Sequence, residues 1–97
     1  MREKQRMKKV RWHILFSGTV QGVGFRYRAA YMAGSLGLTG WVKNLWDGRV
    51  EMAVQGDQSS VEQMIARLKC LQFVEITDVS INPLQLEENE RKFQIFY

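Results

Sequence analysis

The sequence predicts a single α+β domain in which two helices cover one face of a mainly antiparallel sheet. Its 97 residues, of which 45% are apolar, suffice for one modest hydrophobic core. Apolar residues repeat with strand or helix period in the order strand, helix, strand, strand, helix, strand, and a short strand follows at the end. This order is typical of the split βαβ, or ferredoxin-like, sandwich: βαββαβ plus a short C-terminal strand.

The first strand, residues 10–19, is rich in β-branched and aromatic residues. It leads into a segment that contains Gly18, Gly22 and Gly24. A helix is expected next, because apolar residues recur at helical spacing and Gly37 is well placed to cap the C-terminus. The residues at this spacing are Phe25, Ala29, Met32, Ala33 and Leu36.

A β-hairpin and a second helix follow. The expected strands cover residues 41–46 and 49–55, and Asp47-Gly48 between them is typical of two-residue turns in which both central residues have positive φ. Ser59 and Glu62 form a capping-box pattern, so the helix is expected to begin there and to end near Cys70. Its apolar face consists of Val61, Met64, Ile65 and Leu68.

The last third of the chain predicts two more strands. Apolar residues alternate over residues 74–81 but slip by one position near Thr77-Asp78, which indicates a β-bulge. Pro83 ends this strand, and a charged loop leads to a short strand at residues 93–97. With both helices on one face of the sheet, the other face is expected to be more open to solvent.

Positive charge is concentrated at the N-terminus. The formal net charge is +4, but residues 1–13 hold six basic residues and one acidic one, whereas the rest holds eight basic and nine acidic residues. We therefore divide the chain into a basic extension, residues 1–9, and one folded domain, residues 10–97. The extension is interpreted as a solvated tail, and no nucleic-acid partner is expected.

One cysteine and one histidine exclude an intrachain disulfide and a Cys/His zinc site. His13 lies in an apolar strand and is expected to fill space there, and Cys70 is expected to be a small buried apolar residue. The apolar stretch at residues 12–16 is too short for a signal peptide or a membrane span. We therefore expect a cytoplasmic chain with no membrane partner.

The glycine-rich segment together with Arg26 has the features of an oxyanion-binding loop. Glycines at a strand-to-helix turn allow successive backbone N–H groups to point to one place, and the helix N-terminus adds unpaired N–H groups. Arg26, in the first turn, can bind a phosphate in a bidentate manner. Arg28 lies about 200° further around the helix and is expected on the surface. Taken alone, the glycines fit a simple tight turn equally well.

Asn44 is the second candidate site residue. It stands near the end of the second strand, and its side-chain amide offers both a donor and an acceptor that can hold a water molecule. The alternative is a hairpin-flanking residue whose side chain bonds its own backbone.

Residues 18–26, Gly-Thr-Val-Gln-Gly-Val-Gly-Phe-Arg, and residues 40–44, Gly-Trp-Val-Lys-Asn, resemble the two signature motifs of the acylphosphatase family. The resemblance runs from about residue 14 to the C-terminus and includes residues 36–39 and 93–95. Two long motifs at the right separation are a specific signal. The resemblance also implies a ferredoxin-like fold and no requirement for a metal or another cofactor.

The resemblance implies an acylphosphatase, which hydrolyses the carboxyl-phosphate bond of acyl phosphates to a carboxylate and inorganic phosphate. It assigns catalysis to Arg26 and to Asn44, which holds the attacking water. Phosphate binding is assigned to Gln21, Gly22, Val23, Gly24, Phe25 and Arg26. The expected partners are an acyl phosphate substrate and inorganic phosphate, which is product and competitive inhibitor of a monomeric enzyme.

The chemistry suits a site with few titratable groups. The leaving group is a carboxylate, a stable anion at neutral pH, so binding the phosphoryl group and aligning a water suffice. The sequence departs from the family pattern in three places: the longer basic extension, residues 70–73 in place of a Gly/Pro-rich turn, and Phe96 in place of a basic residue. The last change is expected to weaken any C-terminal contribution to closing the site.

Two other functions fit the sequence less well. Ferredoxin-like sheets often bind single-stranded RNA through aromatic residues on the open face, and Trp12, Trp41 and Trp46 are the candidates for such a surface. The central strand, residues 50–54, carries no aromatic residue. The other function is that of a domain acting on carbamoyl phosphate, as resemblance to the first domain of hydrogenase-maturation carbamoyltransferases implies; a free-standing chain argues against it.

Overall fold

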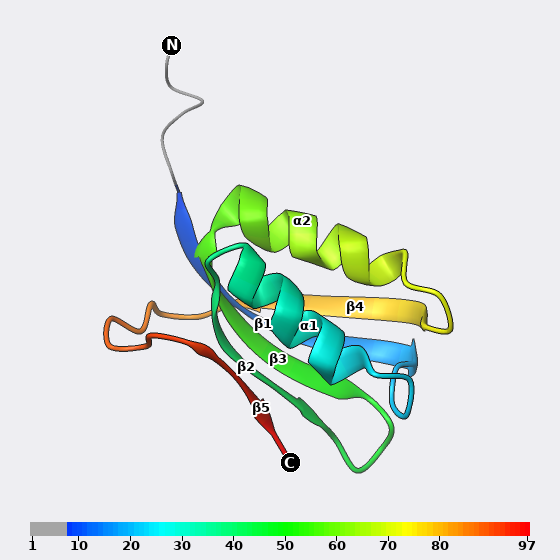
Figure 1. Cartoon of the computed structure of the whole chain (residues 1–97). Coiled ribbons are helices and arrows are strands. Elements are labelled where there is room, and N and C mark those ends of the chain that lie inside the picture. The colour runs from blue at the N-terminus through cyan, green and yellow to red at the C-terminus, as the bar shows by residue number, and fades with distance from the viewer. Residues whose placement is uncertain (1–7) are drawn as a thin grey trace.

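The computed structural model describes residues 8–97, which form two helices and a five-stranded sheet. The elements are β1 (Lys9–Thr19), α1 (Phe25–Ser35), β2 (Thr39–Asn44), β3 (Val50–Asp57), α2 (Gln58–Lys69), β4 (Glu75–Pro83) and β5 (Phe93–Phe96). The strand order is β4-β1-β3-β2-β5, and only the β2–β5 pair is parallel. Both helices lie on the same face of the sheet (Figure 1). The predicted ferredoxin-like α+β class is thus confirmed.

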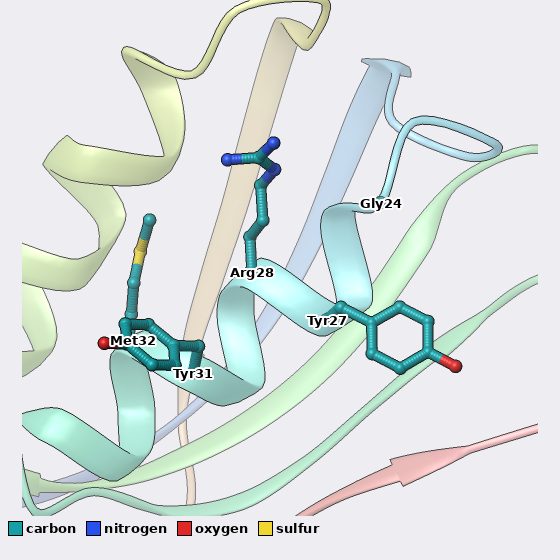
Figure 2. Close-up of a pocket in the computed structure, with 5 residues that line it drawn as sticks. All are labelled: Gly24, Tyr27, Arg28, Tyr31 and Met32. Carbon is teal, nitrogen blue, oxygen red and sulfur yellow. The ribbon is translucent and has the colours of Figure 1, made fainter.

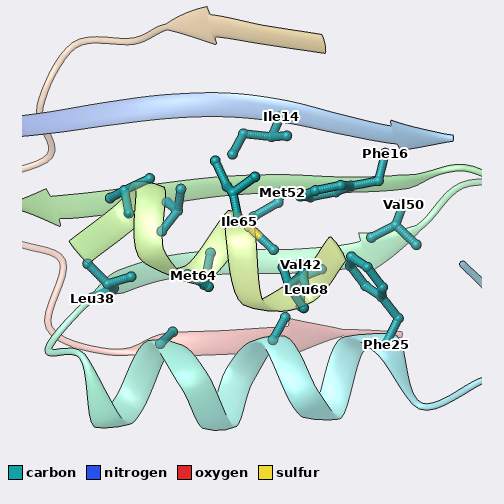
Figure 3. Packing of buried hydrophobic residues seen from close by; sticks show 14 of the residues in the cluster. Ile14, Phe16, Phe25, Leu38, Val42, Val50, Met52, Met64, Ile65 and Leu68 are labelled. Carbon is teal, nitrogen blue, oxygen red and sulfur yellow. The ribbon is translucent and has the colours of Figure 1, made fainter. Parts of the chain in front are cut away.

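The hydrophobic core fills the space between the helices and the sheet (Figure 3). Ile14 and Phe16 of β1 and Met52 of β3 are fully buried there. The rings of Phe16 and Phe25 meet edge to face, with centroids 5.1 Å apart. Such aromatic pairs contribute about 0.5–1.5 kcal/mol beyond their buried area. This contact fixes the first residue of α1 against β1, so both ends of the intervening glycine loop are anchored in the core.

The predicted β-bulge in β4 is confirmed. Ser17 of β1 pairs with Asp78, whereas the next residue, Gly18, pairs with Ile76, so Thr77 is the extra residue. Gly18 has φ 122°, and a Cβ atom there would clash with the backbone carbonyl oxygen of Glu75. Glycine is therefore required at the end of β1, where the chain turns toward the loop.

The hairpin between β2 and β3 is present, but its turn differs from the predicted one. The backbone N–H of Leu45 donates to the carbonyl of Arg49 at 2.8 Å, and that of Gly48 donates to the carbonyl of Leu45 at 3.2 Å. Of the turn residues only Gly48 has positive φ, at 94°. The loop therefore has three residues with glycine in its left-handed position, and the expectation of positive φ at Asp47 was wrong.

The second helix begins earlier than the capping-box pattern predicts. Its N-cap is Asp57, and Ser59 lies inside the first turn, where its hydroxyl donates to the Asp57 carboxylate at 2.6 Å. The predicted capping box of Ser59 and Glu62 was therefore wrong. The same carboxylate accepts a hydrogen bond from the backbone N–H of Lys8, and the Lys8 carbonyl accepts one from Gln58. The start of α2 is thus fixed by the chain just before β1.

Two side chains occupy environments other than those expected. Cys70 is exposed, because it lies about 200° around the helix from the buried Leu68. His13 is only partly buried, and its Nε2 lies 2.7 Å from Oε2 of Glu51. His13 alternates with the buried Ile14 and therefore faces the side of the sheet that no helix covers. It pairs with a carboxylate there rather than filling space in the core.

Candidate active site

The loop between β1 and α1 places backbone N–H groups at the start of a helix. Gly22 and Gly24 have φ values of 74° and 78°, and Gly24 is the N-cap of α1. Within residues 8–97, the backbone N–H groups of Gly22, Val23 and Gly24 donate to no other backbone group. The first bond of the helix runs from the N–H of Arg28 to the Gly24 carbonyl at 3.1 Å. The loop and the first turn therefore present donors suited to an oxyanion.

A pocket of about 100 Å³ brings this loop together with β2. Its lining residues are Val20, Gly22, Gly24, Phe25, Arg26, Tyr27 and Asn44. Five of the residues selected from the sequence thus lie around one small space, although they come from two segments about 20 positions apart. Gln21 and Val23 do not line it, and Val23 packs against the hydrophobic core. Tyr27 was not selected from the sequence. The only signal that could have found it is its position directly after Arg26 in the first turn of the helix.

Gln21 connects the loop to the hairpin. Its side-chain Nε2 donates to the carbonyl oxygens of Leu45 at 2.7 Å and of Arg49 at 2.9 Å. These two carbonyls flank the turn that follows Asn44. The side chain of Gln21 therefore fixes the distance between the glycine loop and the end of β2, and any role in phosphate binding is left to its backbone N–H.

Arg26 contacts the C-terminal residues. Its Nη1 donates to the carbonyl oxygen of Phe96 at 3.2 Å, and its guanidinium carbon lies 5.1 Å from the ring centroid of Tyr97. The contact uses the backbone of Phe96, so no basic side chain is needed at that position for the C-terminal strand to reach Arg26. The hydroxyl of Tyr97 also lies 3.2 Å from that of Tyr27, and this hydrogen bond raises the pKa of Tyr97 above its ordinary value.

Asn44 is the last residue of β2 and pairs with Val50 across the hairpin. Its Oδ1 is buried and has no hydrogen-bond partner within residues 8–97. The alternative in which this oxygen bonds its own backbone is therefore contradicted. A buried carbonyl oxygen without a partner costs about 1–3 kcal/mol, so its presence calls for an explanation. In this pocket the oxygen can accept a hydrogen bond from a bound water molecule.

The charge around the pocket is positive. Arg26 and Arg28 take part in none of the ion pairs found among the described residues. The nearest part of the hairpin carries Asp47, whose carboxylate accepts hydrogen bonds from the backbone N–H of Arg49 at 3.1 Å and from its side chain at 2.9 Å. The backbone hydrogen bond above all lowers the pKa of Asp47. No carboxylate lines the pocket, so an anion would meet no like charge there.

The three tryptophans do not form one stacking surface. Trp12 packs against the hydrophobic core under the helices, whereas Trp41 stacks on Phe96 with ring centroids 5.8 Å apart. Trp46 is 97% exposed at the hairpin turn. The three tryptophans therefore do not form the row of aromatic residues with which ferredoxin-like sheets often bind single-stranded RNA.

Comparison with known proteins gives the same family as the two motifs. The family model described as Acylphosphatase matches residues 12–95. This chain belongs to the acylphosphatase family. An acylphosphatase from Clostridium beijerinckii is 40% identical over 89 residues, which cover 91% of this chain and 99% of that protein. The resemblance inferred from the sequence is thus confirmed, and the chain is an acylphosphatase-type hydrolase of acyl phosphates.

Two solved structures support the same assignment. The acylphosphatase from Bacillus subtilis has a TM-score of 0.84 and 36% identity, and the match covers 91% of this chain and 99% of that one. An acylphosphatase from Coxiella burnetii has a TM-score of 0.84 and 31% identity over 99% of this chain and all of that one. In the part of the chain that the structure describes, neither helix has the length and hydropathy needed to cross a membrane.

Proposed function

We propose that this acylphosphatase binds the phosphoryl group of its substrate in the pocket between the glycine loop and β2. The oxygens of that group are bound by the backbone N–H groups of residues 21–25 and by the guanidinium of Arg26. Asn44 holds the water that attacks phosphorus. The observation that carries this proposal is that Arg26, Asn44 and the loop glycines line one pocket of about 100 Å³.

The reaction needs no proton donor for the leaving group. The water oxygen forms a bond to phosphorus, and the bond between phosphorus and the acyl oxygen breaks with its electron pair on that oxygen. An acyl phosphate dianion and water thus give a carboxylate and dihydrogen phosphate, with both water protons on the phosphate. Charge on the equatorial oxygens is offset by Arg26 and the loop dipoles, which are fixed before the substrate arrives.

Asn44 contributes orientation rather than charge. Its buried Oδ1 has no hydrogen-bond partner among residues 8–97, so a water bound there donates one hydrogen bond to it and turns a lone pair toward the phosphoryl group. In-line attack requires that this water lie opposite the leaving carboxylate. Orienting a water in this way lowers the activation barrier with little effect on the affinity for phosphate.

Inorganic phosphate, the product, is proposed to bind the same pocket and to inhibit competitively. The enzyme is further proposed to act as a cytoplasmic monomer without a metal or cofactor. The few titratable groups around the pocket support a mechanism in which the protein's own dipoles and Arg26 supply the electrostatic stabilisation.

The test is hydrolysis of acetyl phosphate by the full chain in the presence of a chelator, with a phosphate monoester as the comparison substrate. We expect rapid release of phosphate from acetyl phosphate, almost none from the monoester, and competitive inhibition by added phosphate. Activity that disappears with the chelator and returns with a divalent metal would contradict the proposed mechanism.

A further inference from the structure

A buried ion pair lies outside the phosphate pocket and has no part in the proposed mechanism. The guanidinium of Arg11, near the start of β1, donates to both carboxylate oxygens of Glu90, with N–O distances of 2.7 and 3.2 Å. Only 8% of the Arg11 side chain and 18% of the Glu90 side chain are exposed. A buried pair adds little net stability, because taking both charges out of water costs about as much as their attraction returns. Its function is therefore sought in what it holds in place.

The pair ties down the segment between β4 and β5, residues 84–92, which we call the strap. The strap crosses from one outermost strand of the sheet to the other (Figure 1). Its middle is held by Gln55 of β3, which is 3% exposed. The Gln55 Nε2 donates to the carbonyl of Glu87 at 3.0 Å, and its Oε1 accepts from the backbone N–H of Glu87 at 2.7 Å. The strap is thus anchored to two adjacent strands, β1 and β3.

The strap ends where β5 begins, two residues after Glu90. The carbonyl of Lys92 accepts a hydrogen bond from the backbone N–H of Gly40 at 3.1 Å, and β5 then pairs in parallel with β2 alone. This last strand has only four residues. The Arg11–Glu90 pair therefore fixes the point from which a short edge strand starts.

The other end of β5 meets α1 at Arg26. The carbonyl of Phe96 accepts a hydrogen bond from Nη1 of Arg26 at 3.2 Å, and the hydroxyl of Tyr97 lies 3.2 Å from that of Tyr27. Figure 2 shows Tyr27 and Arg28 projecting from α1 in different directions, and the contact with Tyr97 places the end of β5 on the side of Tyr27. The guanidinium of Arg26 is thus held by the last residue of β5.

The position of β5 along β2 decides whether this contact forms. Strand residues are spaced about 3.3 Å apart, so a displacement by even a fraction of one residue carries the Phe96 carbonyl out of hydrogen-bond range of Arg26. Phe93 and Ile95 pack against the core and keep β5 on the sheet. The strap adds a polar anchor just before the strand, which fixes the strand's position along β2.

We propose that Arg11 and Glu90 are positioning residues for Arg26. By tying the strap they fix β5, and β5 holds the guanidinium in the orientation that binds the phosphoryl group. This inference rests on the proposed function, because it takes Arg26 to be a phosphate ligand. Neither Arg11 nor Glu90 lines the phosphate pocket, so they act on it through β5.

The first experiment uses Glu90→Gln in the full chain, which removes one charge of the pair. We expect the Kd of inorganic phosphate, measured by titration calorimetry, and the KM for acetyl phosphate to rise by the same factor, about threefold to tenfold, the effect of losing one orienting hydrogen bond. The kcat should change by less than about twofold, because Arg26 binds the phosphoryl group before and during the reaction alike. A variant that was merely less stable would contain less active enzyme, which lowers kcat and leaves KM and Kd unchanged.

Glu88→Gln is the matched control. Glu88 is an exposed carboxylate of the same strap and takes part in none of the ion pairs found within residues 8–97. This variant should keep the wild-type Kd and KM. Thermal unfolding of each variant verifies that it is folded at the temperature of the assay.

A second pair of variants leaves the buried ion pair intact. Two glycines inserted between Glu90 and Arg91 uncouple β5 from the anchored part of the strap, whereas the same insertion between Gln85 and Leu86 lies before both anchors. Surface loops tolerate insertions of this size. The first insertion should weaken phosphate binding as Glu90→Gln does, and the second should not. These two variants test the proposal even if Glu90→Gln does not fold.

The route through Arg26 is tested in the Arg26→Ala variant, in which no guanidinium remains to be oriented. There Glu90→Gln should cause no further loss of phosphate affinity. Additive losses in the double variant would overturn the positioning role while leaving the proposed function intact, and so would a phosphate affinity that neither Glu90→Gln nor the insertion after Glu90 changes. A wild type that neither hydrolyses acetyl phosphate nor binds phosphate would instead overturn the proposed function.

Discussion

Replacing Asn44 with alanine separates water positioning from phosphate binding. Because the side chain is proposed to orient the attacking water, Asn44→Ala should lower kcat for acetyl phosphate by about 10²–10³, the usual effect of removing one fixed polar group from a transition state. That loss corresponds to about 2.7–4 kcal/mol. The affinity for inorganic phosphate should change by less than about threefold, since Arg26 and the loop N–H groups remain.

The structure also sets the expected effect on stability. The Oδ1 of Asn44 makes no hydrogen bond within residues 8–97, so its removal breaks none and takes away a buried polar atom. The free energy of unfolding should therefore change by less than about 1 kcal/mol, which corresponds to a shift in Tm of less than about 8 °C for a domain of this size.

The assay combines steady-state hydrolysis of acetyl phosphate with thermal unfolding at several phosphate concentrations. Asn44→Ala should be nearly inactive and yet gain as much thermal stability from phosphate as the wild type. Asn82→Ala is the matched control, because it removes the same side chain from an exposed position in β4. If Asn44→Ala melts early but turns over normally, the residue supports the hairpin and has no part in the mechanism.

Three further perturbations test other parts of the structure. Arg26→Ala should lose most activity and phosphate affinity, and Arg26→Lys should lose much of both because an ammonium group cannot bind phosphate in a bidentate manner. Arg28→Ala should retain phosphate affinity. Equal losses in the two alanine variants would refute this placement of charge. Gly18→Ala should destabilise the fold by at least about 2 kcal/mol, seen as a large drop in Tm, because a side chain there clashes with the backbone of β4. The lowered pKa of Asp47 contributes stability that is present above the pKa of the unfolded state and is lost as the pH falls through the pKa of the folded state. Asp47→Asn should therefore flatten the acid side of a plot of Tm against pH. An acid side that stays unchanged would mean that the hydrogen bond from Arg49 does not stabilise the folded state in this way.

Much of the fold could be predicted because its signals are local. The bulge at Thr77 follows from a slip in the alternation of apolar residues, and the end of α1 follows from Gly37, which has φ 72°. Two residues of the candidate site, Arg26 and Asn44, could be selected because they belong to motifs of known spacing. That they line one pocket depends on the pairing of β2 with β3 and on the burial of Phe25, which no local pattern specifies.

The errors arise where tertiary structure overrides a local pattern. Burial of Val42 and Met52 opposite each other sets the hairpin register, and this register leaves three residues for the turn instead of the two that Asp47-Gly48 favours. The start of α2 likewise depends on Lys8, which is distant in sequence and whose backbone N–H donates to Oδ1 of Asp57 while the Ser59 hydroxyl donates to Oδ2. Contacts of this kind cannot be read from residue types within a short window.

The two hydrogen bonds of Gln21 have a consequence for how this enzyme tolerates sequence change. Both acceptors are backbone carbonyl oxygens, which every amino acid possesses, so the side chains at Leu45 and Arg49 are free to vary without loosening the loop. The donor has no such freedom: glutamate at position 21 would offer no N–H, and its carboxylate would repel both carbonyls. The hairpin can thus accumulate substitutions while the glycine loop and the end of β2 keep their spacing, provided that Gln21 and the length of the turn are retained.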